Sequence, residues 1–252
     1  MKKLALLLMM APMLLCGCQE ATPAPVQTQP STFLPAQTQP ETTPSAHSPL
    51  HIEGISTEDV ITYFREVCLN AEFVNSGDPS FLQKWNSPIR YVILGQPTRE
   101  DLDTVESFAA WLNTLEGFPG MTEAEEGAEA NLRIHFCSQE EMISLLGENF
   151  HDSDGGVTFW YEENAIYDAI VCCRTDLEQP LRNSVILEEL YNGLGPIQDT
   201  SLRPDSIIWQ EFSSPQALTA VDALILRLTY HPEMTCGMNA AECEAVIREL
   251  YY

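Results

Sequence analysis

The sequence predicts an α+β domain in which a twisted mixed sheet is followed by a central helix and a small helical C-terminal part. Short apolar segments of strand character alternate with helical segments between residues 56 and 173. One strongly patterned helix then runs into a glycine turn within residues 186–200, and helical segments dominate the rest. This order is typical of a sheet with segregated helices. Roughly 200 residues suffice to bury one substantial core, so we expect a single folded domain at 51–252.

The first half of this domain shows both helix-capping signals and strand patterns. Ser56 to Asp59 is predicted to open one helix, and Thr98, with Asp101 three residues later, is predicted to open another that runs to Glu116. Clusters of apolar and β-branched residues predict strands. These strands are expected at 89–94, 132–137, 157–161 and 165–173, with the last two as a hairpin and a short helix at 138–146.

The C-terminal part is predicted to be a helical unit joined by turns. An apolar segment at 205–209 is followed by Ser214-Pro215, which we interpret as a helix start because Pro is favoured at the first helical position. A turn is expected at 230–238, and a last helix at 240–252.

The central stretch, Ile186 to Thr200, combines an apolar face with a polar one. Apolar residues recur at helical spacing: Leu187, Leu190, Tyr191 and Leu194. Gly193, Gly195 and Pro196 end the helix, since Pro cannot continue it and Gly tolerates the left-handed backbone of a helix end. Glu188 and Asn192 lie four residues apart and therefore project side by side, with Gln198 and Asp199 just beyond the turn.

This layout resembles the zinc-binding helix of metzincin-type peptidases, H-E-x-x-H-x-x-G-x-x-H. With Gly195 on the conserved glycine of that motif, Glu189 falls on the catalytic general base. Glu188, Asn192 and Gln198 fall on the three ligand positions, and none of them is His. One carboxylate and two amides suit zinc poorly. The resemblance therefore implies a metzincin-like scaffold, and we expect neither a metal nor another cofactor.

A second resemblance is closer and covers roughly residues 90–252. A bacterial family of uncharacterised exported proteins carries the patterns E-E-L-x-Q-x-L-G-x-x-N-D, D-S-I-F and L-Y-D-P-x-x-x-x-G-M. The chain matches them at these positions: Glu188, Glu189, Leu190, Leu194, Gly195, Asp199, Asp205, Ser206, Ile207, Tyr230, Pro232, Gly237 and Met238. It departs from them at Asn192, Gln198, Trp209 and His231. The resemblance implies that Met238 lies in a turn beneath the site, as in metzincins.

The N-terminus is predicted to be a lipoprotein signal peptide followed by a tether. Residues 1–17 carry two Lys, a short apolar run and small residues. Leu15-Cys16-Gly17-Cys18 resembles a lipobox, which implies that Cys18 carries the lipid anchor; a cleaved signal without lipid is the alternative. Residues 18–50 are rich in Pro, Thr and Gln and form the tether. The domain is then held at the bacterial cell membrane or outer membrane, on the extracytoplasmic side.

The charge balance excludes one large class of partner. Removal of residues 1–17 takes away two of the 12 basic residues and none of the 37 acidic ones, so the net charge goes from −25 to −27. Such a chain does not attract nucleic acid, and we expect no nucleic-acid partner. It is repelled by anionic membrane surfaces, so membrane attachment depends on the lipid of Cys18.

Six cysteines lie beyond the lipobox, at positions 68, 137, 172, 173, 236 and 243. In an exported protein they allow 15 disulfide connectivities. Cys172 and Cys173 are adjacent in a predicted strand, so they face opposite sides. Cys236 and Cys243 form the most plausible local pair, and buried free thiols are the alternative.

Two functions of different classes follow from these patterns. The first is a non-catalytic binding or structural module, that is, a pseudopeptidase. Its cleft would bind a peptide or glycan through Glu188, Asn192, Gln198 and Asp199. The second is a hydrolase, a peptidase in which Glu189 acts with a non-classical metal or with a second carboxylate. The first is favoured because no classical zinc site is present.

Overall fold

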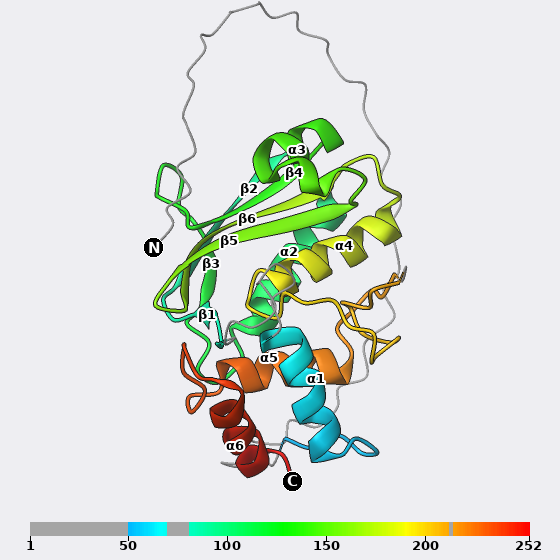
Figure 1. Ribbon diagram of the computed structural model, residues 1–252. Helices are drawn as coiled ribbons and strands as arrows, with labels where there is room; N and C mark the ends of the chain where they lie inside the picture. The colour runs from blue at the N-terminus through cyan, green and yellow to red at the C-terminus, as the bar shows by residue number, and fades with distance from the viewer. Residues whose placement is uncertain (1–49, 70–80, 212–213) are drawn as a thin grey trace, which may run out of the picture. The chain divides into compact units, whose positions relative to one another are not determined.

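The computed structural model describes residues 50–69, 81–211 and 214–252, which belong to one unit spanning Ala46–Tyr252 (Figure 1). The helices are α1 Thr57–Leu69, α2 Arg99–Leu112, α3 Gln139–Leu146, α4 Gln179–Asn192, α5 Ala220–Tyr230 and α6 Ala240–Leu250, with a 3-10 turn, η1, at Glu148–Phe150. The strands are β1 Lys84–Trp85, β2 Ile89–Gly95, β3 Met121–Glu123, β4 Leu132–Cys137, β5 Gly155–Glu162 and β6 Ala165–Arg174.

One mostly parallel sheet joins all six of these strands. Its order is β1-β6-β4-β2-β3, with every neighbour on this path parallel, and β5 pairs with β6 in the antiparallel sense. Residues Glu163 and Asn164 connect β5 to β6 with positive φ angles of 49° and 64°, the twist that tight hairpins need. Strand β5 therefore forms an antiparallel edge of the sheet. The prediction of a mixed sheet with a terminal hairpin is confirmed.

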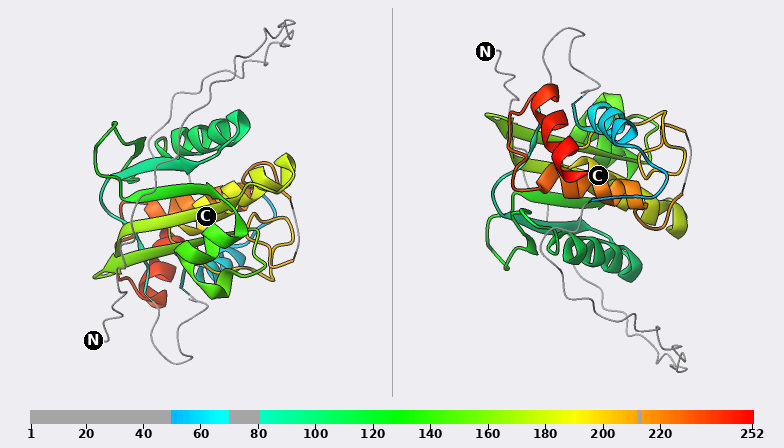
Figure 2. Two further views of the ribbon diagram at one scale, coloured as in Figure 1. Left: turned by 90° about the horizontal axis from the view of Figure 1, so that it is seen from above. Right: turned by 90° about the horizontal axis from the view of Figure 1, so that it is seen from below.

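Helices cover the two faces of the sheet unequally (Figures 1 and 2). Helices α2 and α4 pack against each other, and α4 also packs on β5 and β6, so the main core lies between these helices and the sheet. Helix α3 packs on β5 and β6 and covers a small second cluster of Cys137, Met142 and Cys172. Helices α1, α5 and α6 form the helical part beyond the sheet (Figure 1).

Most predicted helix boundaries are confirmed, and two are corrected. The capping box of Thr98 and Asp101 is present at the start of α2. Helix α2 ends at Leu112 rather than Glu116, because the Asn113 side chain bonds the backbone N and O of Met121 at 2.7 and 2.8 Å and turns the chain into β3.

The helix expected to start at Ser214-Pro215 begins later, at Ala220. Thr219 and Asp222 form its capping box, in which each side chain bonds the other's backbone N–H. This reciprocal cap satisfies two N–H groups of the first turn, so it fixes the start better than Pro215 does. Helix α6 starts at Ala240 as predicted and ends at Leu250.

The prediction of a Cys236–Cys243 disulfide is wrong. All six cysteines among the described residues are free, and five of them are buried. The Cys236 thiol instead donates to the Lys84 carbonyl at 3.6 Å. Cys172 and Cys173 do face opposite sides of the sheet, one under α3 and the other in the main core. The structure therefore agrees with the alternative prediction, that the cysteines are free thiols and mostly buried.

The predicted signal peptide at 1–17, the lipidation residue Cys18 and nearly all of the tether lie outside the described residues. Leu50, the last tether residue, is described, and its backbone N–H bonds the carbonyl of Leu250 at 3.2 Å. Within the described ranges, no helix has the length and apolar character needed to cross a bilayer.

Candidate functional site

Helix α4 is held firmly at both ends. Near its start, Arg182 forms a buried ion pair with Asp101 of α2 at 3.0 Å. Near its end, the indole N–H of Trp85 donates to the Gly193 carbonyl at 2.9 Å, and the Tyr230 hydroxyl donates to the Leu194 carbonyl at 2.8 Å. The positions of the α4 side chains are therefore fixed by contacts from three separate elements.

The turn after α4 depends on Gly195. Its φ angle is 126°, and a Cβ at this position would lie 2.4 Å from the carbonyl oxygen of Gln83. Only glycine tolerates both that backbone conformation and that close approach. The glycine that ends the predicted motif thus sets the path of the chain toward Asp199.

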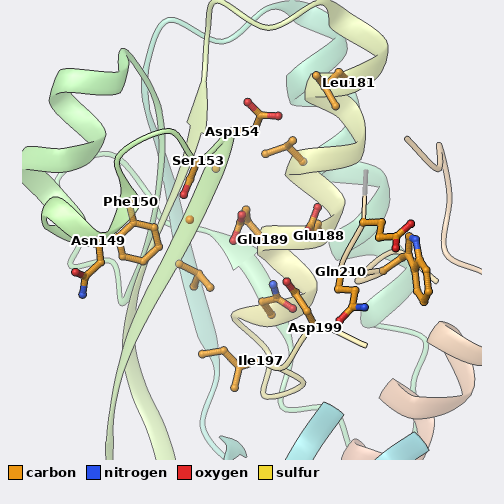
Figure 3. Close-up of a pocket in the computed structure, with 17 residues that line it drawn as sticks. Asn149, Phe150, Ser153, Asp154, Leu181, Glu188, Glu189, Ile197, Asp199 and Gln210 are labelled. Carbon is orange, nitrogen blue, oxygen red and sulfur yellow. The ribbon is translucent and has the colours of Figure 1, made fainter. Parts of the chain in front are cut away.

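A pocket of about 460 Å³ opens between α4 and the start of β5 (Figure 3). This volume lies in the range typical of small-molecule and side-chain binding sites. Helix α4 contributes Leu181, Val185, Glu188, Glu189 and Asn192. The facing wall comes from residues 149–150 and 153–157, and the remaining wall from Ile197, Asp199 and residues 209–211.

The pocket brings together four of the predicted site residues. Glu188, Glu189, Asn192 and Asp199 all line it, and Figure 3 shows Glu188 and Glu189 on α4 with Asp199 near them. Gln198 is not among its lining residues. Its backbone N–H bonds the carbonyl of Val67 in α1 at 3.3 Å.

Met238 is likewise not among the lining residues of the pocket. Its carbonyl accepts from the backbone N–H of Leu82 at 2.9 Å, and its sulfur accepts from the backbone N–H of Thr235 at 3.4 Å. The methionine turn therefore contacts the segment that leads into β1, and Met238 is not among the residues lining the pocket.

The two α4 carboxyl groups lie in an unfavourable electrostatic environment. Burial, with the negative charges of Asp199 and Asp154 nearby, raises the pKa of Glu188 to about 8. Burial, with the charges of Glu188 and Asp199, raises the pKa of Glu189 well above its ordinary value. Neither carboxyl receives a hydrogen bond or an ion pair from the part of the chain that the structure describes. Glu188 is therefore held largely protonated near neutral pH, and burial shifts the pKa of Glu189 in the same direction.

Asn192 is also short of a partner. Its side chain is 7% exposed, and its Oδ1 atom is buried without a hydrogen-bond donor among the described residues. Such orphaned buried acceptors are rare in folded proteins. The polar face of α4 thus presents three groups that lack partners among the described residues.

The facing wall is formed by residues that the sequence alone did not single out. A Cβ on Gly155 would lie 2.5 Å from Val185 Cγ1 and 2.9 Å from Glu189 Oε1, and a Cβ on Gly156 would lie 2.4 Å from the Phe150 ring. The Gly-Gly pair therefore allows β5 to approach α4 closely. Adjacent glycines inside a strand signal such an approach, so the signal was present in the sequence.

The donor set does not fit zinc. Among the described residues, no His lines the pocket. In the described ranges, no three His, Cys, Asp or Glu side chains are arranged to hold one metal ion. Zinc prefers His nitrogen and Cys sulfur in a convergent tetrahedral set. The chemistry of the pocket is therefore that of clustered carboxyl and amide groups.

A match to one protein family covers nearly the whole described domain. The profile of one family, described as a protein of unknown function (DUF2927), matches residues 57–249. The chain belongs to the DUF2927 family. The matched range runs from the first residue of α1 to the last turn of α6, so the DUF2927 domain contains every residue that lines the pocket. A search of curated proteins found no match to this DUF2927 chain.

Proposed function

We propose that this DUF2927 protein is a lipid-anchored, extracytoplasmic binding module on a metzincin-like scaffold, and that the pocket between α4 and β5 holds a peptide or a glycan. The scaffold proposal is supported by the mostly parallel sheet, the antiparallel edge strand β5 beside α4, and the glycine turn that ends this helix. A helical part follows, as the resemblance implies.

A single observation carries the binding role. The polar face of α4 lines an open pocket, yet the carboxyl groups of Glu188 and Glu189 and the Oδ1 of Asn192 have no partner among the described residues. A side chain that served only the fold would be expected to bond a neighbouring strand or loop. A ligand that supplies the missing donors accounts for the arrangement.

The binding role is tested with peptide and glycan arrays probed with the full chain. We expect saturable binding to a defined set of ligands, reduced in Glu189→Gln, a change that preserves the shape of the side chain. Glu126→Gln, in an exposed loop outside the pocket, is the matched control and should bind like the wild type. Absence of any saturable ligand on both arrays would contradict the proposal.

The anchoring part of the proposal rests on Cys18 and is tested separately. Membrane fractionation of cells that express the full chain should place the wild type in the membrane fraction and Cys18→Ala in the soluble fraction. Equal distribution of the two proteins would refute lipid attachment at this residue.

A second function is favoured by one feature, the raised pKa of Glu189. A raised pKa favours the protonated carboxyl, which can donate a proton to a leaving group, and a second carboxyl group of the pocket, when ionised, can activate water. Mass spectrometry of peptide and glycan mixtures would reveal hydrolysis by the wild type that is lost in Glu189→Gln. Cleavage that survives this substitution would exclude Glu189 as the acid.

A further inference from the structure

The first step concerns the kind of chemical group that the pocket lacks. The Oδ1 atom of Asn192 can only accept a hydrogen bond, and it is buried without a donor among the described residues. The carboxyl groups of Glu188 and Glu189 become acceptors only when they ionise, and a neighbouring cation favours their ionised form. A cation that carries several N–H donors therefore fits all three groups.

The second step concerns charge. Within the part of the chain that the structure describes, no Lys, Arg or His lines the pocket, and five acidic residues do: Asp154, Glu188, Glu189, Asp199 and Glu211. One of them, Asp154, is partly neutralised, because Arg174 lies 3.5 Å from its Oδ1. The two Glu residues of α4 have no such counter-charge among the described residues. A positively charged ligand would relieve their mutual repulsion, whereas an anion would increase it.

The third step separates a metal ion from an organic cation. A metal ion needs ligands that converge on one point, and within the described ranges no three acidic, His or Cys side chains do so. A guanidinium group distributes five N–H donors over a plane and can reach acceptors that are spread along a wall. Phe150 and Trp209 also line the pocket, and aromatic faces attract guanidinium groups.

From these contacts we infer that the α4–β5 pocket binds an organic cation, the guanidinium group of an arginine side chain in a peptide, through Glu188, Glu189 and Asn192. This inference rests on the proposed binding function and deepens it by naming the ligand class. The same guanidinium chemistry could be supplied by a small free molecule, so the test includes one.

The test is isothermal titration calorimetry of the full chain with a short Gly-flanked arginine peptide. The matched ligand is the same peptide with citrulline, which keeps the shape of arginine and removes its charge. Methylguanidinium serves as the free cation. We expect the citrulline peptide to bind at least about tenfold more weakly than the arginine peptide, because charge-assisted hydrogen bonds are about twice as strong as neutral ones.

Variants of the protein assign the binding to this pocket. Glu188→Gln and Asn192→Leu should each weaken binding of the arginine peptide about tenfold or more. The first removes the negative charge that pairs with the guanidinium group, and the second removes an acceptor of its N–H donors. Glu126→Gln changes the net charge equally at an exposed position outside the pocket, so its affinity should stay within about twofold of the wild type. Circular dichroism establishes that each variant is folded.

The outcomes distinguish this inference from the broader proposal. Equal affinity for arginine and citrulline peptides would overturn the cationic ligand and leave peptide binding intact. Binding of glycans alone would have the same effect. If no peptide and no glycan binds, both the cationic ligand and the broader binding function are overturned. If methylguanidinium binds as tightly as the arginine peptide, the guanidinium site is supported, and its ligand is a small free cation rather than a peptide. Stoichiometric Zn²⁺ or Ca²⁺ that displaces the peptide would assign the acceptors to a metal and refute the inference.

Discussion

The substitution Glu188→Gln should stabilise the protein at alkaline pH and leave its stability nearly unchanged at acid pH. The pKa of Glu188 is raised from 4.5 to about 8 in the folded protein. Below pH 4.5 the carboxyl is protonated in both folded and unfolded chains, so it contributes no pH dependence. Between pH 4.5 and 8 the unfolded chain loses the proton while the folded chain keeps it, and the free energy of unfolding falls. Glutamine does not ionise and escapes this loss.

The magnitude follows from the two pKa values. One pH unit between them corresponds to about 1.4 kcal/mol, which sets an upper limit of about 5 kcal/mol. The Glu188 side chain is partly exposed to solvent, so water screens part of this penalty. We therefore expect Glu188→Gln to raise the free energy of unfolding by about 2–4 kcal/mol at pH 8. In a domain of this size, each 1 kcal/mol shifts the Tm by about 2–4 °C.

The assay is urea unfolding of wild type and Glu188→Gln at pH 5 and pH 8. The difference between the two proteins is the relevant quantity, because the other acidic residues change the stability of both alike. Glu126→Gln, at an exposed position, should show a difference within about 0.5 kcal/mol at either pH. A Glu188→Gln protein that is less stable than the wild type by the same amount at both pH values would refute the reasoning.

Three further substitutions test the surroundings of the site by urea unfolding. Asp222→Asn should destabilise the protein by about 2–4 kcal/mol, because this buried carboxylate accepts from several groups on two segments; a loss under about 1 kcal/mol would argue against that network. Gly155→Ala should cost about 1–3 kcal/mol, since its Cβ would lie 2.5 Å from Val185 Cγ1, and unchanged stability would show that β5 can move away from α4. Arg182→Leu should cost about 3–5 kcal/mol by leaving the buried Asp101 without its cation. A neutral outcome there would mean that this ion pair does not anchor α4.

The sequence could predict the elements because local patterns determine them. Clusters of apolar and β-branched residues marked β2 and β4, and the capping pair Thr98 and Asp101 marked the start of α2. The start of α5 was misplaced because Pro215 was preferred over Thr219 and Asp222, although their three-residue spacing is also a capping signal. The short strands β1 and β3 were not predicted, because two or three residues carry too little pattern.

The site could be predicted only in part. Helical periodicity placed Glu188 and Asn192 on one face, and the structure brings Glu189 and Asp199 to the same pocket. The position of Gln198 could not be predicted, because it depends on a long-range bond from its backbone to α1. The Gly155-Gly156 pair signals that another element approaches β5 closely, but no local pattern specifies that this element is α4. The prediction that Met238 lies in a turn beneath the site came from a resemblance and stays a prediction, and Met238 is not among the residues that line the pocket.

The most direct test of the account is a carbon-detected NMR measurement of the Glu188 side-chain carboxyl as a function of pH, without and with the arginine peptide. The account predicts a pKa of about 8 in the free protein and a clear decrease when the peptide is bound, because a neighbouring cation favours the ionised form. A pKa near the ordinary value of 4.5 in the free protein, or a raised value that the peptide leaves unchanged, would contradict it.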